Sequence, residues 1–581
     1  MATDQYVPVA DRSELERDGQ TVVSADGTAV ALFHHQDTVY AVDNRCPHMG
    51  FPLAQGSVEN GVLTCHWHHA RFELAEGDTF DPWADDVQTF PVEIRDDTVY
   101  IDPNPEPNVP PATRWRNRLA DGLQENLSLV MAKAVLGLDE ADDGFQTPLE
   151  TAVNFGTRYR AAGWGRGLTT VSYMADLFRT VGGRDRRRAM YTGVTAVADN
   201  CADEPPRFQQ PAFENDRLPK ARLKSWFRRN CEVRDADGAE RCLLTAVDTL
   251  PPGEVTELLV TAATDHLYMN TSHTLDFINS ALSTVEHLGW AEFAPQVLAA
   301  TVPLLTDATR AEEQSAWRQP TDVAALCLDA HDRLPELVAA GAGATWTEPD
   351  GFVETLLSTD PAVIVEALCD AIAAGATRQE LTDAVARAAT RRVAYFDTGN
   401  EFNDWNTVHH TFVYANAAHE LADRTDATEL YRACFDGAMS VYLDRFLNSP
   451  RAPVPGPGDS TREPETIRED LLAAFDEQGA VDRAGRLVAE HFDADGDPTR
   501  LKRALGQGLL REDAGFHTNQ HVGAAVRRFD AVSAAEERRL ALVAGARYLA
   551  AHTPTRRESE QTFSIATRLH RGERLHEATD A

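Results

Sequence analysis

Residues 46–72 read CPHMGFPLAQGSVENGVLTCHWHHARF. Two half-sites in this stretch, Cys46-Pro-His48 and Cys65-His-Trp-His68, are separated by sixteen residues. On successive loops such half-sites can clamp a two-iron cluster, with Cys46 and Cys65 on one iron and His48 and His68 on the other. Two neutral imidazoles in place of thiolates lower the negative charge of the cluster, which makes it easier to reduce than an all-cysteine cluster. Zinc is the alternative, because a Cys₂His₂ set also suits that metal.

The residues that flank the half-sites help to decide between these metals. They form a specific pattern that consists of Gly50, Pro52-Leu53, Gly56, Phe72, Gly77 and Pro91-Val92. Together with the spacing of the half-sites, this pattern resembles the Rieske family over about residues 6–102. The resemblance implies a [2Fe-2S] cluster whose ligands are Cys46, His48, Cys65 and His68.

Four positions near the half-sites refine the resemblance. Phe51 and Ala70 stand in the region where high-potential Rieske proteins carry two further cysteines that form a disulfide. The site therefore resembles the low-potential type found in bacterial ferredoxins and aromatic-ring oxygenases. His69 stands where a glycine is usual, and His66 stands where a proline is usual. We expect these two histidines to affect the tight turn, the docking surface or the reduction potential.

The chain is predicted to be multidomain, with a small all-β domain followed by a large all-α domain. Short β-branched and aromatic runs alternate with turn signals such as Asp26-Gly27 and Asn60-Gly61 in the first hundred residues. A proline-rich segment follows, and beyond it apolar residues recur at helical spacing, as in Leu275, Ile278 and Leu282. The predicted divisions are a Rieske domain at 1–102, a semi-rigid linker at 103–112, a first helical part at 113–450, a loop at 451–464 and a second helical part at 465–581.

The charge balance narrows the choice of partners. The 581 residues include 91 acidic and 55 basic side chains, which gives a formal net charge of −36. Arginine supplies almost all of the positive charge, and the only lysines are Lys133, Lys220, Lys224 and Lys502. Acidic residues spread along the whole chain keep a surface hydrated in concentrated salt, so we expect a halophilic source. The same charge argues against nucleic acid or an anionic membrane as a partner.

Two further features point to a cytoplasmic protein. No apolar run reaches the length of about 18 residues that a membrane span requires. The first residues have neither the basic nor the apolar region of a secretory signal. The six cysteines outside the half-sites are scattered along the chain, and we expect them to be buried as small apolar residues.

The helical region lacks the motifs of several enzyme classes. Ring-hydroxylating oxygenases carry an Asp/Glu-x-x-His-x-x-x-x-His run in a β-sheet-based domain, and neither feature is found here. Gly163-Trp-Gly165-Arg-Gly167 is rich in glycine, but no strand is predicted before it and its spacing does not match a dinucleotide fingerprint. The chain therefore has no recognisable nicotinamide or flavin site of its own.

Histidines on the predicted helices form a candidate second site. His517 and His521 are four residues apart, which places both on one helix face. His409 is predicted to share a face with Asn416 and Glu420.

His273 lies one helical turn from Asp276. We expect His273, His409, His517 and His521 to line an additional mononuclear iron site, because iron with two histidines and a carboxylate suits oxygen activation. The alternative is that these histidines are hydrogen-bonded core or surface residues.

These observations favour an oxidoreductase. The Rieske domain is expected to receive single electrons from an external ferredoxin or ferredoxin reductase, with His48 or His68 facing the acceptor. It would pass them to a site in the helical region that oxidises or oxygenates a small organic substrate. The alternative is a non-enzymatic electron carrier or redox sensor with a helical interaction scaffold. A buried polar pocket that joins His273, His409 and His517 is expected of the enzyme and not of the scaffold.

Overall fold

The computed structural model describes residues 5–106, 109–141, 144–215, 217–454, 458–573 and 575. Its contacts divide the chain into two compact units, one of residues 1–151 with 558–581 and the other of residues 152–557. The predicted fold class is confirmed, because a small β domain precedes a large helical region. No helix in the described part of the chain is long and apolar enough to cross a membrane.

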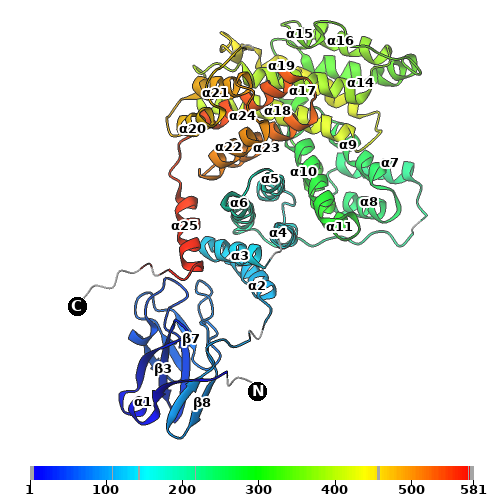
Figure 1. The fold of residues 1–581 in the computed structure, drawn as a ribbon. Coiled ribbons are helices and arrows are strands. Elements are labelled where there is room, and N and C mark those ends of the chain that lie inside the picture. Colours follow the sequence, from blue (N-terminus) through cyan, green and yellow to red (C-terminus); the bar gives the residue numbers. More distant parts are fainter. Residues whose placement is uncertain are drawn as a thin grey trace. The chain divides into compact units, whose positions relative to one another are not determined.

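The β domain consists of three small antiparallel sheets, whose strands are drawn in blue in Figure 1. Their orders are β1-β9-β8, β2-β3-β4 and β5-β6-β7. The elements are β1 (Val7–Asp11), α1 (Arg12–Asp18), β2 (Gln20–Ala25), β3 (Thr28–His35), β4 (Thr38–Asp43), the 3₁₀ turn η1 (Leu53–Gln55), β5 (Ser57–Glu59), β6 (Val62–Thr64), β7 (Arg71–Glu73), β8 (Val92–Arg95) and β9 (Thr98–Ile101).

Tight turns set the register of these strands. Asp26-Gly27 and Asn60-Gly61 have positive φ at both residues, 47° and 81° in the first pair and 52° and 79° in the second. Two consecutive positive φ angles are typical of the type I′ turn, whose twist matches that of the flanking strands. The turn signals in the sequence thus lie where hairpins form.

Three helices belong to the same compact unit as the β domain. They are α2 (Pro111–Gln124), α3 (Ser128–Glu140) and, from the far end of the chain, α25 (Glu558–His570). Helix α2 begins at Pro111, inside the segment predicted as linker, since proline is well suited to the first turn of a helix. Gly137 of α3 lies against the ring of Trp115 of α2, where any larger side chain would clash.

The remaining helices make up the second unit, apart from α4, which straddles the division. They are α4 (Gln146–Arg158), α5 (Arg166–Thr180), α6 (Arg184–Cys201), α7 (Lys220–Glu232), α8 (Ala236–Thr249), α9 (Pro252–Ala263), α10 (His273–Leu288), α11 (Trp290–Ala299), α12 (Pro303–Thr306), η2 (Ala311–Glu313), α13 (Ser315–Arg318), α14 (Val323–Ala340), α15 (Phe352–Leu356), α16 (Pro361–Ala373), α17 (Arg378–Ala394), α18 (Phe402–Ala422), α19 (Leu430–Leu443), η3 (Asp444–Asn448), α20 (Pro464–Ala474), α21 (Val481–Asp493), α22 (Pro498–Leu510), α23 (Phe516–Ala531) and α24 (Ala535–Ala551).

Four of these helices surround the candidate second site. Helix α5 packs against α10 and α23, and α18 packs against the same two helices. A hydrophobic core extends from α5 through α18 to α24, so residues before and after the loop predicted at 451–464 contribute to it. This core holds α18 and α23 side by side although they are far apart in the sequence (Figure 1).

Candidate metal centres

The two half-sites of the β domain lie on loops with the same backbone pattern. In the first loop the N–H of Cys46 donates to Phe51 and the N–H of Gly50 donates to Cys46, each at 2.8 Å. In the second loop the N–H of Cys65 donates to Ala70 at 2.8 Å and the N–H of His69 donates to Cys65 at 3.0 Å. The loops therefore present Cys46 and Cys65 in equivalent positions.

His69 occupies the position of the second loop that corresponds to Gly50 in the first. Gly50 has φ of 82°, and His69 has φ of 65°. A histidine in the left-handed region costs about 1–2 kcal/mol. The tight turn, which glycine would form without strain, is therefore made by His69 as well.

The four side chains are arranged as a cluster site requires. Cys46 and Cys65 are buried, and the thiol of Cys46 donates a hydrogen bond to Cys65. That bond, with further bonds from the N–H groups of Trp67 and His68, lowers the pKa of Cys65. The rings of His48 and His68 have their centres 4.9 Å apart.

The donor atoms fit a two-iron cluster. Nδ1 of His48 is buried without a hydrogen-bond partner among the residues that the structure describes, which is typical of an atom that ligates a metal. Burial, followed by the charges of His68 and Lys133, lowers the pKa of His48 to about 4, so its imidazole is neutral. Two close thiols and two close imidazoles match the ligand set of a Rieske centre.

Comparison with known proteins assigns this domain. The family model described as Rieske [2Fe-2S] domain matches residues 5–91. The chain belongs to the Rieske family. This Rieske domain implies a [2Fe-2S] cluster, and its homology to ferredoxin components of dioxygenase systems implies electron transfer.

Three curated relatives illustrate the extent of the similarity. The ferredoxin subunit of 3-phenylpropionate/cinnamic acid dioxygenase from Photorhabdus laumondii is 36% identical over 74 residues, which are 12% of this chain and 70% of that protein. The ferredoxin component of the naphthalene 1,2-dioxygenase system from Pseudomonas putida is 31% identical over 81 residues, 14% of this chain and 78% of that protein. Human apoptosis-inducing factor 3 is 33% identical over 89 residues, but this chain spans only 15% of its length.

One solved structure is similar to a part of the chain of about the same length. The ferredoxin of carbazole 1,9a-dioxygenase from Nocardioides aromaticivorans IC177 is 25% identical, covers 17% of this chain and 98% of its own, and has a TM-score of 0.17. Each of these matches covers less than a fifth of this chain, so the chemistry of the helical region has to be deduced from its own residues.

The helical region brings three histidines together. One ligand atom from each of His273, His410 and His517 lies within 4.8 Å of the others, and all three residues are half-buried. We call these residues the histidine triad. They come from α10, α18 and α23, three of the four helices described above.

Neighbouring oxygens orient two members of the triad. Oδ2 of Asp276 lies 3.1 Å from Nδ1 of His273, and Oδ1 of Asn406 lies 3.2 Å from Nδ1 of His517. Both Nδ1 atoms can donate to these acceptors, which leaves the two Nε2 atoms as lone-pair donors. Nε2 of His410 lies 3.4 Å from Nε2 of His517. Oxygen acceptors behind metal-binding histidines commonly fix the ring tautomer in this way.

Two members of the triad, His410 and His517, are neutral, as ligation requires. Burial, followed by the charges of neighbouring groups, lowers the pKa of His410 to about 2 and that of His517 to about 4. Neutral imidazole is the form that binds a metal. Three close imidazole nitrogens fit a transition metal, and because the residues are half-buried, further coordination positions can be reached from outside.

His409 and His521, which the sequence analysis grouped with His273 and His517, lie deeper. Both are fully buried, and their Nδ1 atoms lie 3.1 Å apart. The second nitrogen of His409 contacts Oε1 of Gln520 at 3.2 Å, and the ring of His521 stacks on Tyr548 with centres 4.0 Å apart. These two histidines form the wall behind the triad.

Helix-face spacing favours His409, so His410 is not among the ligands predicted from the sequence. Adjacent helical residues point about 100° apart, so one of the two necessarily leaves the site. The signal that would have favoured His410 is Asn406, one turn earlier on the same face, which holds His517. Asp276 contacts His273 and is not part of the group of close ligand atoms, so three histidines replace the expected two histidines and a carboxylate.

The backbone that leads into His273 is strained. Tyr268, Asn270, Thr271 and Ser272 all have positive φ, between 43° and 88°. Such a run of residues other than glycine costs about 1–3 kcal/mol per residue and is typical of functional sites, where surrounding contacts maintain it.

Polar contacts hold this strained segment from several sides. The side-chain amide of Asn270 donates to Leu304 at 3.1 Å, and its Oδ1 accepts from the N–H of Thr309 at 3.0 Å. Oδ2 of Asp436 accepts from the N–H of Tyr268 at 3.2 Å. The start of α10, and with it His273, is thereby fixed.

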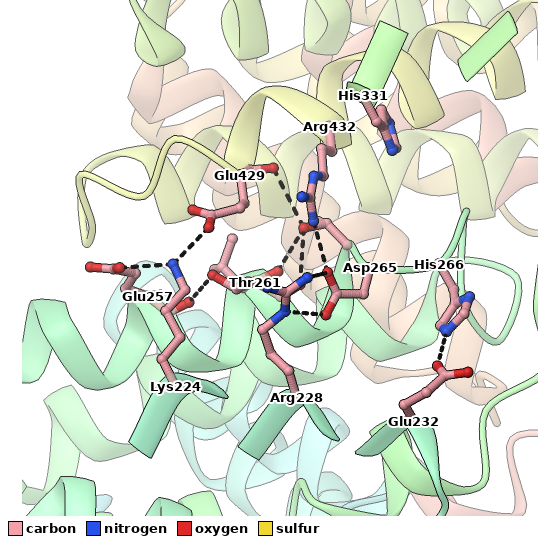
Figure 2. Close-up of polar contacts among 12 residues, drawn as sticks. Lys224, Arg228, Glu232, Glu257, Thr261, Asp265, His266, His331, Glu429 and Arg432 are labelled. Atoms are coloured by element: carbon pink, nitrogen blue, oxygen red, sulfur yellow. Dashed lines mark hydrogen bonds and ion pairs between the residues drawn. The ribbon is translucent and has the colours of Figure 1, made fainter. Parts of the chain in front are cut away.

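A surface pocket of about 570 Å³ lies just upstream of this segment, lined in part by α7. Asp265, which lines the pocket, accepts from Arg228 at 2.6 Å and from Arg432 at 2.8 Å. Figure 2 shows these three side chains together. His266 lies between Glu232 at 2.6 Å and Glu312 at 2.7 Å. This network anchors the chain a few residues before His273, and we assign it a structural role.

Proposed function

We propose that this protein is a Rieske oxidoreductase whose cluster relays single electrons from an external ferredoxin or ferredoxin reductase to a metal at the histidine triad. The triad would then serve the oxidation or oxygenation of a small organic substrate. The observation that carries the proposal is the convergence of His273, His410 and His517, three half-buried imidazoles, from three helices.

We propose iron as the metal at the triad. Imidazole ligands suit zinc, copper and iron alike. Zinc has no redox chemistry, so it could not accept electrons from the Rieske domain. Bound iron with open coordination positions would supply oxygen activation. The residues of the chain orient the ligands through Asp276 and Asn406.

The surroundings of the triad support an organic substrate. The ring of Phe277 stacks on His273 with centres 4.8 Å apart, and Phe516 lies 5.6 Å from the same ring. Arg166 lies over Phe516 at 5.9 Å. Two aromatic rings beside a metal site, with one cation at their edge, suit an apolar molecule that carries a polar or anionic group.

The surface of the Rieske domain supports an external donor. His68 and the neighbouring Trp67 are exposed, whereas His48 is half-buried and packs against Trp83. We therefore propose His68 as the point of electron entry. The ferredoxin relatives named above belong to systems with separate components, which agrees with a donor on another chain.

We also propose that the protein works in the cytoplasm of a halophilic organism. At a net charge of −36, the acidic side chains would repel one another strongly at low ionic strength. Concentrated salt would screen this repulsion. The temperature of unfolding is expected to rise with potassium chloride concentration. No change with salt would contradict this part of the proposal.

The second candidate function is a non-enzymatic electron carrier or redox sensor with a helical scaffold. It is favoured by the relatives that are ferredoxins in their own right, since these match little beyond the Rieske domain.

Metal content separates the two functions. We would measure iron, copper and zinc per chain in protein purified without oxygen, for the wild type and for a Cys46→Ser/Cys65→Ser variant. The enzyme is expected to retain iron in the variant, at the triad, after the two cluster irons are lost. A variant without metal would support the carrier, and a variant with zinc alone would contradict electron transfer to the triad.

A further inference from the structure

Lys133 of α3 reaches the loop that carries the first half-site. It is one of four lysines in the chain, and it is buried, with 9% of its side chain exposed. Its Nζ donates to the carbonyl oxygen of Pro47 at 2.7 Å. Pro47 stands between the ligands Cys46 and His48, so the ammonium group lies against the cluster loop itself.

Asp85 of the Rieske domain pairs with this lysine. The carboxylate forms a short ion pair with Lys133 and accepts from Nε of Arg118 at 3.1 Å. Burial alone would raise the pKa of Asp85, but the charges of Lys133 and Arg118 hold it below its ordinary value. Asp85 is therefore ionised, and the buried group comprises two cations and one anion.

Arg118 of α2 joins the same group to the other side of the cluster. Its guanidinium donates to the carbonyl oxygens of Pro82 at 2.9 Å and Ala84 at 3.1 Å. Between them lies Trp83, whose ring centre is 4.7 Å from that of the ligand His48. The hairpin of α2 and α3 thus contacts both segments that surround His48.

Reduction adds one negative charge to the cluster. A buried cation stabilises the added electron and raises the reduction potential, and a buried anion lowers it. Charges inside the protein act more strongly than surface charges and are less sensitive to salt. Lys133 and Asp85 should therefore shift the potential in opposite directions.

We propose that Lys133, supplied by the helical hairpin outside the Rieske domain, is a positioning residue that holds the Cys46–Gly50 loop and raises the reduction potential of the cluster, while Asp85 opposes it. The proposal rests on the cluster that the Rieske domain implies and does not depend on the histidine triad. If the histidine triad binds no metal, the proposal for Lys133 still holds.

Redox titration of the full-length protein tests the proposal, with the visible absorption of the cluster as readout. Lys133→Gln removes the charge and keeps a donor, and Lys133→Met removes both. Both are expected to shift the midpoint potential to more negative values, and Asp85→Asn is expected to shift it to more positive values. A loss of packing alone would not produce opposite signs from the two partners of one ion pair.

A surface charge provides the matched control. Arg17→Gln in α1 removes one positive charge from the same domain at a side chain that is 68% exposed, and it is expected to leave the potential unchanged. The shift caused by Lys133→Gln is expected to persist in high salt. Shifts of the same sign in Lys133→Gln and Asp85→Asn, or no shift, would overturn the proposal. If neither Lys133 variant retains the cluster, a potential of Asp85→Asn at or below that of the wild type would overturn it.

Discussion

Nε2 of His410 lies 3.4 Å from Nε2 of His517, although 107 residues separate the two along the chain. Two nitrogens bound to one tetrahedral metal at ordinary bond lengths are about 3.3 Å apart. The helices α18 and α23 thus hold this pair at the spacing that a metal requires. The arrangement of the triad leads to the first two predictions.

Removal of one triad histidine is expected to abolish the second metal site. His410→Ala should lose the metal that a cluster-free variant retains, since two remaining imidazoles bind a transition metal far more weakly than three. Metal per chain, measured in the Cys46→Ser/Cys65→Ser background, checks this. His419→Ala is the matched control, because His419 lies on the same helix but contacts Thr382 instead of the triad. Equal metal content in both variants would disprove the assignment of the triad.

Asp276 is expected to strengthen metal binding without touching the metal. Asp276→Asn keeps an oxygen near Nδ1 of His273 but removes the charge, so affinity should fall about 10- to 100-fold. Competition with a chromogenic chelator measures this change. Asp329→Asn on α14, where the side chain is 75% exposed, serves as the control. An unchanged affinity for Asp276→Asn would mean that the carboxylate only holds Ser272, whose hydroxyl donates to it at 3.2 Å.

Because the backbone at His69 is strained, we expect two substitutions at this position to change the stability of the Rieske domain in opposite directions. His69→Gly should stabilise the Rieske domain by roughly 0.5 kcal/mol, because relief of about 1–2 kcal/mol of strain exceeds the conformational entropy cost of about 0.4–1 kcal/mol. His69→Val should destabilise it, since a β-branched residue tolerates positive φ least. The side chain of His69 is exposed, so little packing is lost in either variant. The temperature at which the visible absorption of the cluster disappears ranks the stability of the two variants and the wild type. A glycine variant that is less stable than the wild type would contradict the prediction.

Because Asp444 is buried, we expect the folded protein to lose stability at higher pH. Burial raises its pKa to about 7, from an ordinary value of 3.8. The folded state then holds a proton that the unfolded state releases, so stability falls as the pH rises from about 4 to about 7 and stays low above. The total effect is on the order of a few kcal/mol.

Asp444→Asn should remove this loss, because the amide oxygen can still accept from Thr411, which donates at 2.6 Å in the wild type. The difference in unfolding temperature between variant and wild type is expected to grow from pH 5 to pH 8. Asp426→Asn, at a fully exposed carboxylate, should show no such growth. A constant difference for Asp444→Asn would mean that Asp444 is ionised in the folded protein.

The cluster site was predictable from the sequence because its determinants are local. Each half-site places a cysteine and a histidine within four residues, and the turn residues that shape both loops stand beside them. The hairpins at Asp26-Gly27 and Asn60-Gly61 likewise follow from the backbone preferences of two adjacent residues. Helical spacing of apolar residues sufficed to distinguish the region after the linker from the β domain.

The convergence of the triad and the contact of Lys133 with Pro47 were decided by tertiary structure. Whether His409 or His410 faces the site depends on the rotation of α18 about its axis. Packing against α10 and α23 sets this rotation. Adjacent residues of a helix point about 100° apart, so only one of the two can face the site. Lys133 gives no sign in its own helix of a contact with Pro47, because that contact exists only when α3 packs on the Rieske domain. Local patterns thus determined which elements form and which four side chains are the candidate cluster ligands, whereas contacts between residues far apart in the chain determined which other side chains lie together.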